Sequence, residues 1–176
     1  MFFYSVVVAP PVGGGSPLEG IWRIAPEAGA FGVGPALGDI SWFSNAVGGL
    51  TTRACFFDDE YVFNADRSFK NVLGTETFLE AWQGTDPDAC GTPVFPHDGT
   101  ATATYAYDEA AGIIKIDGKG AFLGLAKVNN AGELAAPGDA PDSITYDVTE
   151  FDEAVGTITL DINFGPGFWI YKLVKQ

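Results

Sequence analysis

Apolar and polar residues alternate along most of this chain, and long stretches with apolar residues at helical spacing are almost absent. Alternation turns one side of a strand toward a core and the other toward solvent, so the pattern predicts β-strands. Glycine and proline are abundant and well spread, which supplies many turns. The predicted strands span residues 20–24, 40–44, 56–63, 68–73, 100–107, 112–117, 143–149, 155–163 and 168–174.

These strands follow one another closely, so they are expected to pair mostly antiparallel. The fold class is therefore all-β, either a barrel or a sandwich, because both use the same alternation and the same turns. One short helix is expected at residues 75–83, where Phe78, Leu79 and Trp82 have compatible spacing; the segment is short enough for a strand to remain the alternative. The glycine-dense segment 118–124 predicts a bulge or a bend at which backbones approach closely.

The first nine residues do not fit the amphipathic pattern. Residues 1–9 are aromatic and β-branched, apolar on both faces, and are followed by a tether at 10–17 with three prolines and three consecutive glycines. Such a tether is no tight hairpin turn, so the arm's pairing partner lies elsewhere. We predict a detached strand at 1–9, the tether at 10–17 and a single β domain at 18–176. The residues of the detached strand that are expected to contact its pairing partner are Phe2, Phe3, Tyr4, Val6, Val7 and Val8.

The net charge of −14, from nine basic and 23 acidic side chains, narrows the range of partners. This charge repels phosphate backbones and anionic lipid heads, so we expect neither nucleic-acid binding nor membrane insertion. The acidic composition and a single pair of cysteines, Cys55 and Cys90, fit a secreted protein with one disulfide. Two buried free thiols in a cytosolic protein are the alternative. The first eighteen residues lack the basic start of a secretory signal and are interpreted as mature protein.

Three short motifs carry a resemblance to a known family. They are Gly20-Ile21-Trp22, the segment 58–69 with Phe63-Asn64-Ala65-Asp66, and the closing strand 168–174 with Trp169 and Lys172-Leu173. Together they resemble the lipocalin-like domains of secreted bacterial proteins, and also accessory domains of secreted polysaccharide-degrading enzymes. The resemblance implies an antiparallel barrel or sandwich with carbohydrate as the ligand. It covers residues 20–175, leaves out the arm, and has Arg67 where the family's turn usually has glycine.

Residues suited to catalysis or metal binding are sparse. His97 is the single histidine and lies in a proline-rich loop, where a bond to Asp98 or to solvent is the expected role. Glu76 and Glu80 are four residues apart, a spacing that a solvated helix face explains as well as a glycosidase does. Residues 58–60 are all acidic, but neighbouring strand residues point to opposite faces, so a negative outer face is expected rather than a calcium site. We expect no enzymatic activity, no metal and no cofactor.

Aromatic residues make up 14% of the chain, and flat rings stack well on sugars. Trp42, Phe43 and Trp82 lie in or beside predicted loops and are the candidate glycan contacts. Trp22 and Trp169 lie on alternating strands and are expected in the core.

Three functions fit these features. The first is a structural subunit of an extracellular filament, which inserts its arm as a strand into the next copy in a head-to-tail polymer. The second is a secreted carbohydrate-binding module whose arm pairs with its own sheet. The third is a lipocalin-like carrier with a small apolar ligand inside a barrel.

Overall fold

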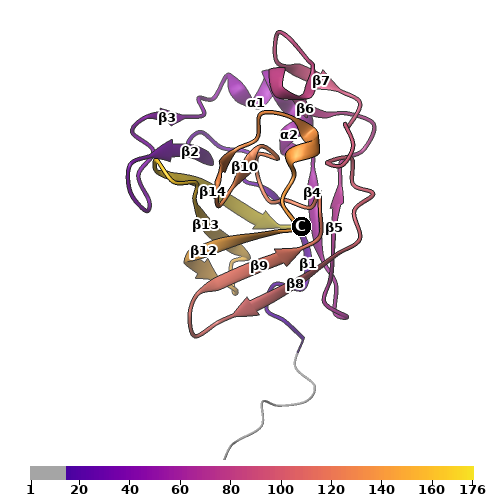
Figure 1. Ribbon diagram of the computed structural model, residues 1–176. Helices are drawn as coiled ribbons and strands as arrows, with labels where there is room; N and C mark the ends of the chain where they lie inside the picture. The colour runs from indigo at the N-terminus through magenta and orange to yellow at the C-terminus, as the bar shows by residue number, and fades with distance from the viewer. Residues whose placement is uncertain (1–14) are drawn as a thin grey trace, which may run out of the picture.

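A computed structural model describes residues 15–176 and shows an antiparallel barrel of eight strands, which decides between barrel and sandwich (Figure 1). The strands follow the chain order around the barrel, and the first closes on the last through the pairs Trp22–Lys175 and Ile24–Leu173. The barrel strands are β1 (Gly20–Ile24), β4 (Glu60–Phe63), β5 (Ser68–Val72), β8 (Ala103–Asp108), β9 (Ile113–Asp117), β12 (Ser143–Asp152), β13 (Thr157–Asn163) and β14 (Phe168–Lys175).

The connections between barrel strands carry short additional elements. Strands β2 (Phe31–Gly34) and β3 (Phe43–Ser44) extend the main sheet from β14, and two small hairpins join β6 (Thr77–Leu79) to β7 (Ala89–Gly91) and β10 (Val128–Asn129) to β11 (Gly132–Glu133). The helices are α1 (Gly49–Thr52) and α2 (Ala54–Phe57), with 3-10 turns at Ala81–Gln83 and Pro137–Asp139. None of the described helices is long and apolar enough to cross a membrane.

The predicted helix at 75–83 is wrong. Thr77 and Leu79 alternate inward as strand β6, and only Ala81–Gln83 is helical, ending at Gly84 with a left-handed φ of 92°. The helices lie instead just before β4, where α2 takes residues that the pattern assigned to a strand. Three of its four residues are buried, so the run contains no polar positions from which a period could be read.

The core fills the barrel with the inward side chains of alternating strands. Trp22 and Trp169 are both buried, as predicted, and the indole N–H of Trp22 donates to the carbonyl of Leu18 (2.8 Å). Leu18 is itself buried together with Ser16, so the chain is packed from the start of the described region. The predicted arm at 1–9, with its six interface residues, lies outside the described residues.

Candidate functional site

One end of the barrel is filled by its own chain. Every residue from Gly120 to Leu125 is buried, and side chains from three barrel strands hold this segment, which we call the plug. The Tyr61 hydroxyl accepts from the Gly124 N–H (3.1 Å) and the Tyr146 hydroxyl accepts from the Leu123 N–H (2.9 Å). Asn71 makes two hydrogen bonds to the backbone of Phe122 (2.8 and 3.2 Å).

The plug explains why the glycine-dense segment is irregular, and it confirms the predicted close approach of backbones. A Cβ on Gly120 would overlap the carbonyl of Pro96, and one on Gly124 would overlap the ring of Tyr171. A cavity beside the plug has a volume of about 10 Å³. A cavity of that size holds about one water molecule. The carrier hypothesis would need room for a small apolar ligand, which this cavity does not offer.

Two of the titratable side chains that line this cavity are buried, and the sequence predicted neither position. Asp59 is buried, with one carboxyl oxygen accepting from Thr77 Oγ1 (2.7 Å) and the other, Oδ1, without a hydrogen-bond partner within residues 15–176. His97 is buried too, and its Nδ1 has no partner among the described residues. Its ring instead packs edge-on against Trp82, with centroids 5.4 Å apart. The expectation of a loop histidine bonded to Asp98 or solvent is therefore wrong.

Burial shifts the pKa values of these two groups toward their neutral forms. Loss of water raises the pKa of Asp59 to about 8, and the neighbouring charge of Asp58 adds to the effect, against the hydrogen bond from Thr77. Burial lowers the pKa of His97 to about 4, opposed by the charge of Asp98. At neutral pH a protonated carboxyl and a neutral imidazole therefore line a space for about one water molecule.

The acidic run at 58–60 is divided among three environments, which corrects the expectation of a uniformly negative face. Asp58 is exposed, Asp59 is buried, and Glu60 pairs with Arg23 (2.6 Å). Glu76 and Glu80 do not share a helix face, because β6 separates them, and Glu80 pairs instead with Lys127 (3.0 Å). The described residues contain no group of three or more His, Cys, Asp or Glu side chains arranged to hold a metal.

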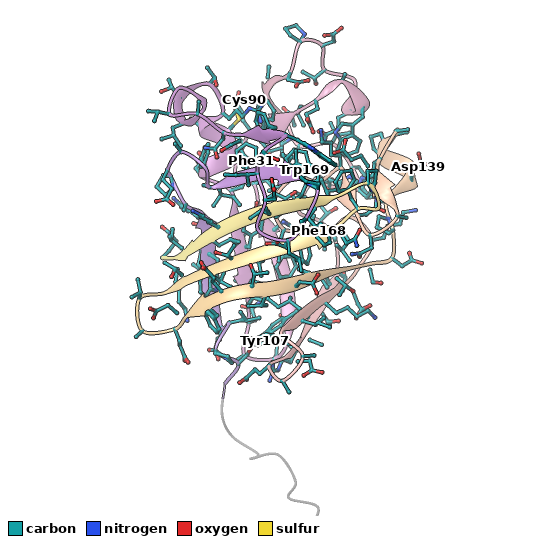
Figure 2. The ribbon with its side chains drawn as sticks, turned by 90° about the vertical axis from the view of Figure 1, so that its left-hand side faces the viewer. Phe31, Cys90, Tyr107, Asp139, Phe168 and Trp169 are labelled. Carbon is teal, nitrogen blue, oxygen red and sulfur yellow. A yellow bond between two sulfur atoms is a disulfide. The ribbon has the colours of Figure 1, made fainter. Side chains whose placement is uncertain are left out.

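The predicted disulfide between Cys55 and Cys90 is present and ties α2 to β7. It closes a loop across 35 positions of the chain. In the chain-entropy picture, closing such a loop stabilises the fold by about 3–4 kcal/mol. Cys90 lies near the upper end of the barrel in Figure 2, so the bridge fastens the hairpin that covers the buried pair of Asp59 and His97.

The three candidate glycan contacts lie in different surroundings. Trp42 is 54% exposed, and its six-membered ring rests against the backbone of Gly167. Phe43 is partly exposed and packs against Phe31 and Trp169, with ring centroids 5.9 and 6.3 Å away. Trp42 and Phe43, which are neighbours in the sequence, are therefore both accessible at the surface.

Trp82 is less accessible than these two. Its indole N–H donates to Glu80 Oε2 (3.2 Å), and the other oxygen of Glu80 accepts from Lys127. Lys127 also pairs with Glu133 (3.6 Å), which accepts from the indole N–H of Trp169 (2.8 Å). This network joins Trp82 to the core tryptophan and holds its ring half-buried.

Comparisons of the chain with known protein families, with curated proteins and with solved structures find no match.

Proposed function

We propose that this protein is a structural subunit of an extracellular filament, which polymerises by donating residues 1–9 as a strand to a neighbouring copy. The observation that carries the proposal is that the barrel is closed without residues 1–14. Strand β1 pairs with β4 on one side and with β14 on the other, so no position beside the first barrel strand is open for the arm. The barrel of a single chain is therefore complete without the arm.

The composition of the arm also supports this role. No charged side chain precedes Glu19, whereas the whole chain carries a net charge of −14. Two copies with this charge repel each other, and the arm is the part that can approach a second copy without adding to the repulsion. A strand that is apolar on both faces gains from burial on both, and its backbone groups complete an open sheet edge. A head-to-tail contact of this kind propagates as a fibre.

The barrel topology is the one that the lipocalin-like resemblance implies, and it supports that family as part of the proposal. Arg67, which stands where the family's turn usually has glycine, adopts a left-handed φ of 68°. Glycine adopts this conformation without strain, so the turn geometry is consistent with the motif. Secretion is proposed on the same basis, together with the single disulfide, because disulfides persist in oxidising compartments.

We expect deletion of residues 1–12 to abolish polymerisation while leaving a folded monomer. The barrel and its core lie within the residues that remain, so the thermal midpoint should stay within a few degrees of the intact chain. Negative-stain microscopy and analytical ultracentrifugation would measure assembly, and circular dichroism would measure folding. Within the intact chain, Val6→Asp should block assembly and Ser5→Ala should not. An intact chain that remains a compact monomer, with a truncated chain that unfolds, would overturn the proposal.

Carbohydrate binding is a second candidate function, favoured by the environment of Trp42. Its ring is fixed on one side by the backbone of Gly167 and is more than half exposed, which is the arrangement needed to stack on a pyranose face. Such a ring loses little conformational entropy on binding. In this reading the protein is a secreted glycan-binding module that resembles the accessory domains of polysaccharide-degrading enzymes.

If this second function is correct, Trp42→Ala should lower affinity for the bound polysaccharide by about 5- to 140-fold, which corresponds to the loss of roughly 1–3 kcal/mol that one stacked aromatic contributes. Affinity electrophoresis against a panel of neutral and acidic polysaccharides would measure it. Leu37→Ala is the matched control, because Leu37 has the same exposed fraction as Trp42, 54%, but no ring to stack. An equal effect of both substitutions, or binding to no polysaccharide, would contradict carbohydrate stacking.

A further inference from the structure

We propose that the free edge of β3 is the surface that receives the arm of the next copy. This inference rests on the proposed function of strand donation and names its acceptor. Within the described residues, β3 is the strand of the main sheet with a single neighbour, because it pairs with β2 alone while every barrel strand pairs on both sides. Unpaired backbone groups at a sheet edge are the standard site for addition of an extended segment.

The outward backbone groups of this edge can be identified from its bonds to β2. The Asn45 N–H donates to the carbonyl of Phe31 (3.1 Å). The Trp42 N–H also donates to β2, at the carbonyl of Val33 (3.0 Å), so regular alternation does not extend to Trp42. Between Ser44 and Asn45, successive N–H groups point in opposite directions, so the N–H of Ser44 is directed away from β2. Asn45 itself is buried, and its side-chain amide both accepts from the Phe31 N–H (3.0 Å) and donates to the Glu27 carbonyl (2.9 Å). The edge is therefore held in place by a buried anchor.

The chain segment that contains this edge exposes several large apolar side chains. Four of the eight large apolar residues that the described chain exposes lie within residues 37–47. They are Leu37, Trp42, Phe43 and Val47. Arg53 lies beside Phe43, with its guanidinium carbon 5.9 Å from the centre of the ring. An uncharged, aromatic and β-branched occupant matches this surface, and residues 2–8 have that composition.

The position of the edge favours the arm of a second copy over the chain's own. The described chain starts at the lower end of the barrel, whereas β2, β3 and α1 lie at the upper end (Figure 1). Six residue steps of β14 separate the partners of Trp22 and Val33, a distance of about 20 Å along the strand. The six steps from Ala9 to Gly15 span at most about 20–22 Å, and Gly15 precedes Trp22. Pairing of Ala9 with the β3 edge of its own chain would thus require a fully stretched tether, and pairing through earlier residues would require the arm itself to run along the barrel.

A donor at one end of the barrel and an acceptor at the other also give the polymer a direction. Each copy presents its β3 edge to one neighbour and its arm to the opposite neighbour. The two surfaces are different, so the contact is heterologous and leaves one unused edge and one unused arm at the ends of a growing chain. This polarity follows from the placement of β3 at the end of the barrel opposite to the start of the described chain (Figure 1).

A cross-linking experiment on the intact protein tests both the acceptor and the origin of the arm. A photoreactive amino acid at Val6 is introduced into unlabelled protein, which is mixed with ¹⁵N-labelled protein that lacks it and then allowed to assemble. Tandem mass spectrometry should find the unlabelled residue 6 joined to labelled peptides containing residues 41–47. Cross-links to 41–47 within one chain would overturn both strand donation and the acceptor. Cross-links between chains at another surface, or none within assembled polymers, would overturn the acceptor alone.

A pair of substitutions provides a second measurement. Val47 and Val155 are 70% and 72% exposed, but Val155 lies in the turn between β12 and β13, away from β3. Val47→Glu should slow elongation, measured by light scattering, by about tenfold, since it removes the burial of one aliphatic side chain at the contact. Val155→Glu adds the same charge and should leave elongation unchanged. If both substitutions slow elongation equally, charge repulsion alone explains the effect, and the proposal that the β3 edge is the acceptor is overturned.

Discussion

Replacement of Gly124 by alanine is expected to lower the free energy of unfolding by about 2–5 kcal/mol, one of the largest effects expected from adding a single methyl group to this protein. Gly124 has a left-handed φ of 75°, a conformation that costs roughly 1–2 kcal/mol in residues with a Cβ. The new methyl would also overlap the ring of Tyr171, which is fully buried and cannot rotate away. Overpacking of this kind costs about another 1–3 kcal/mol.

Gly74→Ala separates these two causes. Gly74 has a similar φ of 62°, but nothing lies within 4 Å of the position its Cβ would take. The Gly74→Ala variant should therefore lose only the conformational contribution, about 1–2 kcal/mol of the free energy of unfolding. Urea unfolding of both variants, followed by tryptophan fluorescence, would measure the difference. If Gly124→Ala and Gly74→Ala have the same midpoint, the plug is loosely packed and the interior has more room than the structure shows.

A tightly held plug also bears on the proposed function. Tyr61, Tyr146 and Asn71 each bond to its backbone, so the barrel interior is tied together by hydrogen bonds as well as by apolar packing. The proposed subunit would therefore complete its fold before assembly, with one edge of its main sheet unpaired among the described residues. A free apolar strand can cause aggregation by pairing with exposed strand edges. Because most other strand edges are already paired, such a subunit would offer few other sites for this pairing.

The strands were predictable because their patterns are local. Phe63 and Phe69 alternate with polar residues around a turn rich in Asn and Asp, and the structure pairs them directly across the β4–β5 hairpin. The second hairpin, with Tyr105 opposite Ile116, follows from the same two signals. The disulfide was predictable for a different reason, since a chain with two cysteines allows one pairing. The choice of a barrel over a sandwich was not predictable, because closure of the barrel depends on pairing between residues some 150 positions apart.

The buried pair could not be predicted because its burial is created by distant segments. Asp59 stands between two other acidic residues, which alone indicates an exposed position. It is covered by β6 and by the plug, and neither segment has a regular pattern that reveals where it packs. The burial of His97 likewise depends on Trp82 and Phe122, which approach it from two other connections. Local periodicity contains no information about such contacts.

The stability of the protein is expected to fall by about 2 kcal/mol between pH 6.5 and pH 8, because Asp59 titrates in the folded state. Its pKa is about 8 when folded and near 3.8 when unfolded, so between these values the folded state holds a proton that the unfolded state has lost. The stability contributed by the protonated form is complete below pH 3.8 and declines as the pH rises toward 8. His97 has the opposite sign, since its pKa falls from 6.5 to about 4 on folding.

These two titrations overlap in part of the range. The contribution of neutral His97 is complete above pH 6.5 and is lost as the pH falls to about 4, so between pH 4 and 6.5 the two slopes oppose each other. Above pH 6.5, of these two groups only Asp59 still makes the free energy of unfolding change with pH. A group that changes by one proton contributes about 1.4 kcal/mol per pH unit, which gives the expected fall over one and a half units.

Asp59→Asn should remove this slope, because the amide cannot ionise while its oxygen can still accept from Thr77. Chemical denaturation at half-unit steps from pH 6 to 8.5 would give the free energy of unfolding of each variant. Asp58→Asn is the matched control, since Asp58 is the exposed neighbour and should keep a slope close to that of the parent protein. Asp161, whose pKa burial also raises, is present in all three proteins and cancels from the comparison. Parallel profiles for the parent protein and Asp59→Asn would mean that the Asp59 carboxyl is ionised in the folded barrel and that water or a cation reaches its second oxygen.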